Sequence, residues 1–466
     1  MVHSLIVQAS APQASAAIPV HCVSKAGLAG LLAELAPLAR RFAEAQGFSA
    51  SVGQHLVLPN EAGAIVAVLL GVEAADARRR DPFAPGRLAA LLPAGDYALA
   101  GEIGDPDLAA LGWLLQGYRF ERYRKSATKT GRLVLPEGVD GEDLIRIAES
   151  VALARDLVNT PANDLGPAEI EASIRALAAE CGATATAIMG DDLIARNFPM
   201  IHAVGRASPR APRLIDLVWG DLAHPKITLV GKGVAFDTGG LDLKPSAGML
   251  LMKKDMGGAA AAIAAARMIM LAKLPVRLRL LVPAVENAVS GSSFRPGDVL
   301  ASRKGLSVEI GNTDAEGRLI LADALALADE EAPELLIDYA TLTGAARTAL
   351  GPELPPFYTH DDGLAAEIGR LGEAVNDPVW RMPLWPNYER MLDSRIADLN
   401  HVSGGSFAGS VTAALFLNRF VEKTASYAHF DIYAWNPSGK PGRPEGGECQ
   451  AARLTYALAK QLYPAG

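Results

Sequence analysis

Four carboxylates stand out because they lie beside glycines and lysines in three short loops. Asp314 and Glu316 are two residues apart in the stretch NTDAEGRLILADAL, which continues as an apolar helix pattern. Asp237 lies in VGKGVAFDTGGLDLKPSAGM, and Asp255 lies in KKDMGGAAAA just before a second helix pattern. Carboxylates do not gather in a partly buried cleft without a counter-charge, which divalent cations supply. Bridging carboxylates hold two metals about 3.5–4 Å apart, so the pattern favours a two-metal site.

Each of these residues also has a simpler interpretation when it is taken alone. Asp255 suits a helix N-cap, and Asp314 and Glu316 suit a turn and the first turn of a helix. Lys232, in the stretch VGKG, suits a surface lysine. The metal interpretation depends on their joint occurrence in three loops that we expect to follow buried strands.

Other familiar catalytic patterns are absent from the sequence. It contains no GxxxxGK[ST] phosphate loop, and GKGVAF does not fit the GxGxxG pattern. The eight histidines form no HExxH pair, and no GxSxG stretch occurs. The sequence therefore does not fit the zinc peptidases of the HExxH type or the serine hydrolases with a GxSxG motif.

The elements that must position the acids alternate between strand and helix patterns. KITLVGKGVAF, RLRLLVPAV and ELLIDYATLTG are continuous apolar runs typical of buried strands. GGAAAAIAAARMIMLAK and EGRLILADALALADEE are typical of helices. Such alternation predicts an α/β fold with a mainly parallel central sheet covered on both faces. Ligands of such sheets gather beyond the carboxyl ends of the strands, where we expect the acidic loops to meet.

The chain has 466 residues, which is too long for one ordinary core. Its first part reads as a smaller α/β domain, with a helix pattern in AGLAGLLAELAPLARRFAEAQG and strand patterns in HLVLP and AIVAVLLGV. DPDLAALGWLLQGYRFERYR reads as a further helix that starts at an N-capping aspartate, and DLIRIAESVALARDLVNT as a long connecting helix. We predict an N-terminal α/β domain over 1–140, a connecting helix over 141–160 and a larger catalytic α/β domain over 161–466.

Composition narrows the functional class and the compartment. The formal net charge of −8 argues against a nucleic-acid partner. Three widely spaced cysteines form no disulfide framework, which fits a reducing cytosol. No lysine or arginine precedes Lys25, so we expect no secretory signal and a cytoplasmic location. The most apolar long segment is interrupted by Arg267 and Lys273, so we expect a buried helix and no membrane partner.

Several of these stretches closely resemble the leucyl aminopeptidases, also called cytosol aminopeptidases. LVGKGVAFDTGGLDLKPSAGM, KKDMGGAA and NTDAEGRLILADAL carry the resemblance, and RDLVNTPAND, IHAVGR and YATLTGA extend it over most of residues 150–430. NTDAEGRL is a near-unique signature of that family. The resemblance implies a metal-dependent aminopeptidase that hydrolyses the N-terminal residue of peptides with a free N-terminus, through a water activated by two metals. It also implies a homohexamer.

The resemblance assigns roles residue by residue. Two divalent ions per subunit, Mn²⁺ or Zn²⁺, would be held by Lys232, Asp237, Asp255, Asp314 and Glu316. Lys244 would stabilise the oxyanion, and Arg318 would hold a bicarbonate that serves as proton shuttle. Lys232 can ligate a metal only as a neutral amine, so its pKa must fall well below about 10.4. The substrate-binding positions would be Met252, Asn312, Thr341, Leu342 and Gly344.

The sequence departs from the family pattern after HFDI. Tyr433 and Ala434 stand where the family usually carries a small Ala-Gly pair, and the WNPSGKPGRPEGGECQAARL that follows also differs from the usual glycine-rich ending. That part of the family's domain helps to line the side-chain pocket. A tyrosine there would shorten the pocket or give it a polar lip, so a leucine preference is not carried over.

Two other functions remain open at this point. Some members of the family act as hexameric DNA-binding or regulatory proteins, although the charge of −8 argues against this alternative. The metal centre could also act on a phosphoester or another amide. Lys244 and Arg318 are both present, which by resemblance favours peptide hydrolysis.

Overall fold

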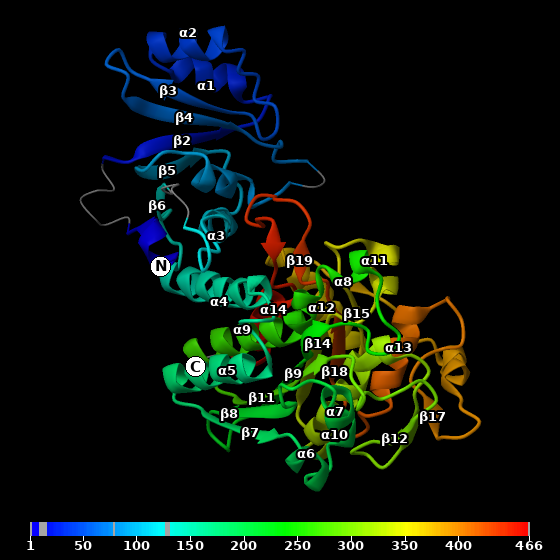
Figure 1. Cartoon of the computed structure of the whole chain (residues 1–466). Coiled ribbons are helices and arrows are strands. Elements are labelled where there is room, and N and C mark those ends of the chain that lie inside the picture. Colours follow the sequence, from blue (N-terminus) through cyan, green and yellow to red (C-terminus); the bar gives the residue numbers. More distant parts are fainter. Residues whose placement is uncertain (1, 9–15, 78–79, 126–130, 465–466) are drawn as a thin grey trace. The chain divides into compact units, whose positions relative to one another are not determined.

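The computed structural model describes residues 2–8, 16–77, 80–125 and 131–464 (Figure 1). Part of the N-terminal stretch in which we expected no secretory signal, residues 9–15, lies outside the described residues. The chain divides into two compact units, Met1–Ala152 with Ser438–Glu445 and Leu153–Pro437 with Gly446–Gly466. The division falls inside the long helix α4 (Gly141–Asn159). The domain limits proposed from the sequence stay a prediction.

The first unit is built on a sheet in which six strands are described, in the order β1-β6-β5-β2-β4-β3. All neighbouring pairs are parallel except β3 with β4. The strands are β1 (Ile6–Val7), β2 (Ile18–Val23), β3 (His55–Pro59), β4 (Ile65–Gly71), β5 (Asp96–Gly101) and β6 (Arg132–Val134). The helices are η1 (Val2–Leu5), α1 (Leu28–Glu34), α2 (Pro37–Ala45), η3 (Ala84–Ala90) and α3 (Pro106–Gln116).

Proline explains one difference from the sequence prediction in this unit. The single helix expected over AGLAGLLAELAPLARRFAEAQG is two helices, because Pro37 starts α2 and forces Ala36 to a ψ of 146°. The predicted N-cap of α3 is confirmed, since the Asp105 carboxylate accepts a hydrogen bond from the amide of Leu108 at 2.9 Å. That helix ends at Gly117 and does not continue through the polar residues that follow.

The second unit is built on a mainly parallel sheet, in which nine strands are described. Eight of them follow the order β16-β15-β18-β14-β9-β11-β8-β7, and β10 pairs with the far part of β11. The central strands β18, β14, β9 and β11 run parallel to one another, whereas β15 beside β18 and β8 beside β11 are antiparallel. The strands are β7 (Thr184–Met189), β8 (Arg213–Trp219), β9 (Lys226–Gly231), β10 (Gly233–Asp237), β11 (Arg277–Asn287), β14 (Leu335–Ala340), β15 (Pro356–Tyr358), β16 (Trp380–Arg381) and β18 (Tyr427–Asp431).

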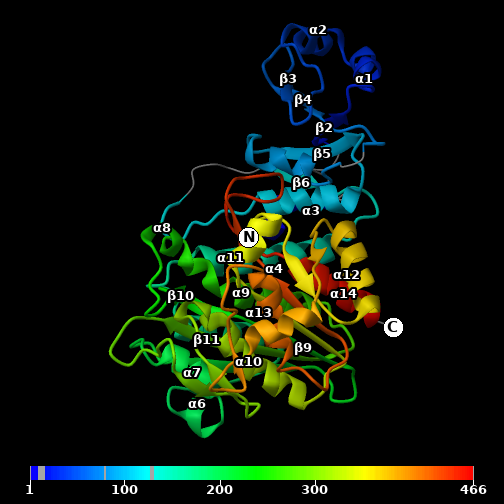
Figure 2. The same cartoon turned by 90° about the vertical axis from the view of Figure 1, so that its right-hand side faces the viewer.

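Helices cover both faces of this sheet. The apolar helix α9 (Gly257–Leu271) packs on one face with α5 (Pro167–Cys181), and α10 (Glu316–Glu330) and α7 (Pro199–Gly205) pack on the other (Figures 1 and 2). The predicted α/β architecture with a small N-terminal and a larger C-terminal part is confirmed. Among the described helices, none combines the length and the apolar character needed to span a bilayer.

Short elements complete the second unit. Its further helices are α6 (Asp192–Ala195), α8 (Ser246–Met249), η4 (Met252–Met256), η5 (Thr313–Ala315), α11 (Gly344–Leu350), α12 (Asp362–Ala374), η6 (Pro386–Leu392), α13 (Gly409–Asn418) and α14 (Ala452–Leu462). A small sheet pairs β12 (Val299–Ala301), β13 (Ser307–Glu309) and β17 (Leu399–Asn400), and a hairpin pairs β19 (Trp435–Asn436) with β20 (Gly446–Gly447).

The acidic loops do not leave three strands of the central sheet, so that expectation is wrong. Asp237 is the last residue of β10, and Asp255 lies in η4 on the segment that connects β10 to α9. Asp314 and Glu316 follow β13, which belongs to the small sheet. The two segments still meet, because Asn287 at the end of β11 donates both to the Asp237 carboxylate and to the carbonyl of Thr313.

Candidate active site

Lys232 interrupts a strand, and this interruption brings its side chain into the site. The run predicted as one strand is split into β9 and β10 at this residue. The amide of Lys232 donates to the carbonyl of Tyr339 in β14 at 2.9 Å, and its carbonyl accepts from Ala259 at the start of α9 at 2.8 Å. Lys232 is only 3% exposed, so the surface-lysine interpretation is wrong.

Three buried acids lie around the ammonium of Lys232. One carboxylate oxygen from each of Asp237, Asp255 and Glu316 lies within 4.8 Å of the others. Nζ of Lys232 lies 2.8 Å from Oδ2 of Asp255 and 2.9 Å from Oε1 of Glu316. It also donates to the carbonyl of Thr341 at 2.9 Å. Residues that are far apart in the sequence therefore form one charged cluster.

Asp314 and Lys244 extend this cluster toward the solvent. Nζ of Lys244 lies 2.9 Å from Oδ2 of Asp237 and forms an ion pair with Oδ1 of Asp314. The Asp314 side chain is one-third exposed, and the side chain of Asn312 accepts a hydrogen bond from its amide at 2.8 Å. The side chain of Asn312 thus makes the hydrogen bond that stabilises the turn in NTDAEG. The side chain of Asp314 belongs to the charged cluster instead.

The N-cap interpretation of Asp255 is also wrong. The residue at the start of α9 is Met256, which makes no side-chain cap. Oδ1 of Asp255 instead accepts a hydrogen bond from the hydroxyl of Thr341 at 2.7 Å. The end of β14 therefore orients this carboxylate toward Lys232.

The cluster holds more negative than positive charge. Burial and then the charge of Asp237 raise the pKa of Glu316 well above its ordinary value, and the same two causes raise the pKa of Asp314 to about 6. Burial would lower the pKa of Lys232, but the carboxylates of Asp255 and Glu316 outweigh it and raise that pKa. Four carboxylates thus face two ammonium groups, an arrangement that further cations would stabilise.

The donor atoms fit divalent cations. Oε2 of Glu316 accepts no hydrogen bond within the described part of the chain, although the residue is only 1% exposed. Among the same residues, Oε1 of Glu316 and Oδ2 of Asp255 have only the shared ammonium of Lys232 beside them, at 2.9 and 2.8 Å. Buried carboxylate oxygens without donors are unfavourable unless a cation binds them, and carboxylate-rich sites suit Mn²⁺, Mg²⁺ and Zn²⁺.

Asn287 supports the cluster and was missed by the sequence analysis. At the end of β11, its amide donates to Oδ1 of Asp237 at 2.8 Å and to the carbonyl of Thr313 at 3.1 Å. The amide of Gly239 donates to the same carboxylate oxygen at 2.8 Å. Such partners orient metal-binding carboxylates. The available signal was a polar residue two positions after the apolar run RLRLLVPAV.

Arg318 lies in the first turn of α10, with its guanidinium buried at the cavity. Nη1 donates to the carbonyl of His401 at 2.7 Å, and Nε has no hydrogen-bond partner among the described residues. Burial lowers the pKa of Arg318 to about 10, while the charges of Glu316 and Asp431 act in the opposite direction. The guanidinium thus remains available for an anion. His401, which holds it, was not found from the sequence.

A cavity of about 560 Å³ opens beside the cluster. Tyr433 lines this cavity and does not point into the core, and Lys254, Thr343 and Arg347 lie in its wall as well. Glu316 does not line the cavity, but one of its carboxylate oxygens lies within 4.8 Å of those of Asp237 and Asp255, which do. The sequence-predicted residues that line the cavity are Lys232, Asp237, Lys244, Met252, Asp255, Asn312, Asp314, Arg318, Thr341, Leu342 and Gly344.

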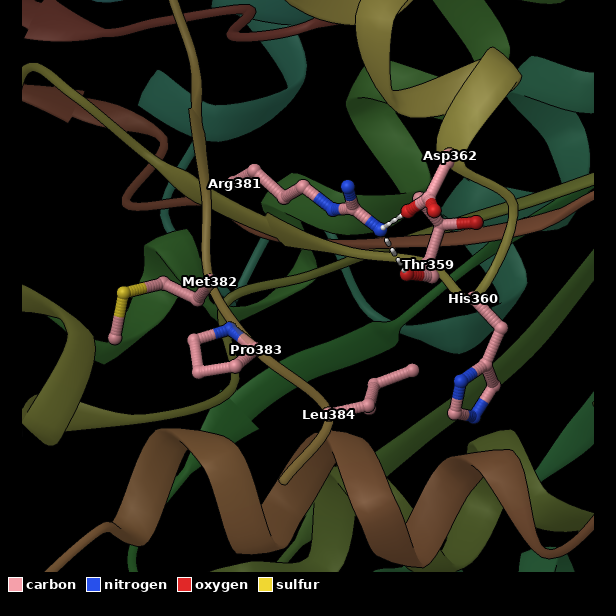
Figure 3. Close-up of a pocket in the computed structure, with 7 residues that line it drawn as sticks. All are labelled: Thr359, His360, Asp362, Arg381, Met382, Pro383 and Leu384. Carbon is pink, nitrogen blue, oxygen red and sulfur yellow. Dashed lines mark hydrogen bonds and ion pairs between the residues drawn. The ribbon is translucent and has the colours of Figure 1, made fainter. Parts of the chain in front are cut away.

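A second cavity, of about 490 Å³, lies beside β15 and β16 (Figure 3). Arg381 turns toward Asp362, 2.6 Å away, and also donates to the carbonyl of Thr359 at 3.2 Å. Its charge is therefore satisfied, and the wall brings no cluster of carboxylates together. The remaining lining residues are His360, Met382, Pro383 and Leu384.

Comparisons with known proteins agree with the geometry. Residues 152–456 match the family model described as "Cytosol aminopeptidase family, catalytic domain", and residues 18–136 match "M17 aminopeptidase, N-terminal domain". The probable cytosol aminopeptidase of Syntrophotalea carbinolica is 42% identical over 368 residues, which cover 75% of this chain and 74% of that protein.

Solved structures are similar over almost the whole chain. The cytosol aminopeptidase of Coxiella burnetii superposes with a TM-score of 0.93 at 44% identity, over 99% of this chain and 100% of that one. The bottromycin maturation enzyme BotP, in complex with Mn, gives a TM-score of 0.85 at 33% identity, over 96% of this chain and 99% of that one.

Proposed function

The chain belongs to the cytosol aminopeptidase family and is a metal-dependent aminopeptidase, and we propose that the acid cluster around Lys232 is its catalytic centre. The family resemblance and the aminopeptidase function inferred from the sequence are confirmed by the family match. The matched proteins favour peptides over phosphoesters as substrates, and they give no support to the DNA-binding alternative.

The observation that carries the proposal is the group of three buried acids within 4.8 Å, extended by Asp314. Two divalent cations, Mn²⁺ or Zn²⁺, would be held here; when bound, they would activate a water and polarise the peptide carbonyl. The Mn in the BotP structure supports the choice of manganese. The ligands would be Lys232, Asp237, Asp255, Asp314 and Glu316.

Lys232 has to lose a proton to serve as a ligand. Its ammonium now offsets part of the charge of Asp255 and Glu316, at 2.8 and 2.9 Å. Cations would take over this role and favour the neutral amine. Metal affinity should therefore rise with pH.

Lys244 and Arg318 are the two residues that we assign to the reaction itself. Lys244 reaches the outer side of the cluster, where its ammonium can stabilise negative charge on the carbonyl oxygen. Arg318 would hold a bicarbonate through its unpartnered Nε, as the family resemblance suggests. Such an anion can carry a proton from the attacking water to the leaving amine.

The N-terminal residue of the substrate would lie in the cavity of about 560 Å³. We assign its recognition to Met252, Asn312, Thr341, Leu342 and Gly344. Because Tyr433 also lines the wall, this cavity differs from one with a small residue there.

A panel of aminoacyl-p-nitroanilides tests the proposal. Initial rates are measured on metal-free protein and on protein loaded with Mn²⁺ or Zn²⁺, with N-acetyl-leucine-p-nitroanilide as the blocked control. We expect turnover only with metal and only with a free amine. The proposal would be overturned if the blocked substrate were hydrolysed. It would also be overturned if fully metal-loaded protein hydrolysed no substrate of the panel.

The same family resemblance supports a homohexamer and a cytosolic location, which we propose for this chain as well. Relatives at 42–45% identity are named cytosol aminopeptidases. Light scattering coupled to size exclusion tests the hexamer, because a monomer or dimer at working concentration would contradict it. Fractionation of the source cells tests the location.

A further inference from the structure

Lys254 is a buried cation that the catalytic proposal does not use. It is 5% exposed and contributes to the wall of the active-site cavity. Its Nζ lies 4.4 Å from the centre of the Tyr433 ring. Within the described residues, this ammonium has no hydrogen-bond acceptor and no carboxylate within 4.0 Å. An ammonium taken out of water without a counter-charge is unfavourable.

The other cations of the cavity each have an assigned partner. Lys232 and Lys244 pair with the acids of the cluster. Arg347 pairs with Asp431 at 2.6 Å. Arg318 is reserved for the anion at the reacting centre. Lys254 is thus the positive charge in this wall that is still without an anion.

Tyr433 fixes where the Lys254 ammonium lies. Two cations lie over this ring. Nζ of Lys254 is one, and the guanidinium of Arg347, at 5.8 Å from the ring centre, is the other. Cation–ring attraction holds an ammonium in place but does not neutralise it. Asp255, next in the sequence, is already engaged by Lys232 and Thr341. The ammonium is therefore positioned and still has room for a charged ligand.

We propose that Lys254 determines specificity by binding a substrate carboxylate, that of an N-terminal glutamate or aspartate side chain. The inference rests on the proposed function of the site. Lys254 directly precedes Asp255 and lies against Tyr433, at the part of the cavity assigned to the side chain of the N-terminal residue. A carboxylate and an ammonium attract each other strongly where water is largely excluded.

The test compares glutamyl- and glutaminyl-p-nitroanilide, which have nearly the same shape and differ in charge. Neither carries a peptide C-terminus, so only the side chain can supply the carboxylate. We expect kcat/KM for the glutamyl substrate to exceed that for the glutaminyl substrate by about tenfold or more. In Lys254→Met this ratio should fall toward one, and in Lys254→Arg most of it should remain.

Lys253→Met is the matched control. The Lys253 ammonium donates to the carbonyl of Asn159 at 2.6 Å and lies over Trp435, and the residue is not part of the cavity wall. The same substitution one position away should leave the glutamyl-to-glutaminyl ratio at its wild-type value. Metal content and thermal midpoint are measured for every variant, so that a folding defect is recognised.

Three results would overturn the proposal: a wild-type ratio near or below one, a ratio unchanged in Lys254→Met, or an equal change in Lys253→Met. Free dipeptides and dipeptide amides form a second arm. If Lys254→Met slows Ala-Ala selectively over Ala-Ala-amide and leaves the glutamyl ratio unchanged, the bound carboxylate is the peptide C-terminus and the side-chain assignment is wrong.

Binding of free amino acids keeps this test separate from catalysis. Calorimetry should find that wild-type protein binds L-glutamate more tightly than L-glutamine, with the difference lost in Lys254→Met. This measurement stands even if no p-nitroanilide is hydrolysed, which would refute the proposed function. Equal affinities in wild type would refute the role of Lys254 and leave the aminopeptidase assignment intact.

Discussion

A Cβ atom placed on Gly317 would lie 2.5 Å from Cε and 2.7 Å from Nζ of Lys232. In proteins, a Cβ atom essentially never lies closer than 3.0 Å to a heavy atom outside its own residue and its two chain neighbours. The Lys232 end cannot easily move, because Asp255, Glu316 and Thr341 surround it. The first turn of α10 therefore needs glycine to admit the lysine.

We predict that Gly317→Ala lowers kcat/KM by about 100-fold, because displacement of Lys232 disturbs the metal ligands. Steady-state kinetics and metal analysis measure the effect, and circular dichroism checks the fold. Gly369→Ala in α12 is the control, since a Cβ there meets nothing within 4 Å and alanine favours a helix. A fully active Gly317→Ala protein would show that Lys232 can be relocated without loss.

Removal of metal should abolish activity. Dialysis against a chelator is expected to reduce the hydrolysis of leucine-p-nitroanilide to background, and added Mn²⁺ or Zn²⁺ should restore it, because the cations supply charge for the acid cluster and activate the water. Loaded protein should also melt at a higher temperature, since the ions bind only the folded state. Full activity of a preparation shown by elemental analysis to be metal-free would exclude this mechanism.

Glu316→Gln and Asp255→Asn should lose metal and most of kcat while the protein still folds. The amides keep the shape of the side chains and remove the charge that the dications require. A loss of at least about 100-fold is expected. Asp216→Asn, which removes a charge paired with Arg279 away from the site, is the control. If both site variants kept the wild-type metal content and rates, Glu316 and Asp255 would not be metal ligands.

Tyr433→Ala should shift the substrate ranking. Removal of the ring enlarges the cavity, so kcat/KM for leucine, methionine and phenylalanine substrates should rise relative to alanine. A misfit of one methylene is worth about 1–3 kcal/mol, so the preference should shift and not switch. Metal content should stay the same. An unchanged order across the four substrates would mean that Tyr433 does not limit the pocket.

Glu448→Gln should destabilise the second unit in a pH-dependent way. Nη2 of the buried Arg155 lies 3.1 Å from Oε2 of Glu448, and Asn436 donates to the same oxygen at 2.6 Å. Burial would raise the pKa of Glu448, but Arg155 and the hydrogen-bond donors outweigh it and lower that pKa. Loss of one partner of a buried pair costs about 3–5 kcal/mol.

The sign of the pH effect follows from the lowered pKa. The Glu448 carboxylate contributes its full stability above the unfolded value of about 4.3, and this contribution is lost as the pH falls through the lower folded value. Urea unfolding should therefore show a large difference between wild type and variant at pH 7 and a smaller one below about pH 4. A difference that stays constant with pH would argue against an ionised Glu448.

Local patterns in the sequence were enough for the central strands and for α9 and α10, because continuous apolar runs and helical spacing are set by neighbouring residues. They could not show that Asp314 follows a strand of the small sheet. That sheet pairs Val308 with Leu399, about ninety positions apart. The residues of the two short segments do not indicate that the segments pair with each other. The break at Lys232 was hidden in the same way, since there the Lys232 amide donates to the carbonyl of Tyr339 and its carbonyl accepts from the amide of Ala259, both far away in the sequence.

The candidate site was predicted mainly through the resemblance, which named residues within intact motifs. Asn287, His401 and Lys254 were missed because each is a single polar residue with no spacing to a partner in the sequence. Their positions become meaningful only when several strand ends meet. Tyr433 was noticed as a departure from the pattern, and only the structure placed its ring against Lys254.

The segment Ser438–Glu445 belongs to the first unit although both flanking strands, β19 and β20, belong to the second. The amide of Gly442 donates to the side chain of Gln116 at 2.9 Å, and Arg443 lies over the ring of Phe83. A shortened protein that starts at residue 153 would keep this segment and remove its partners. Anyone who expresses the catalytic half alone should therefore replace the segment by a short turn between Asn436 and Gly446, or express the missing half alongside it.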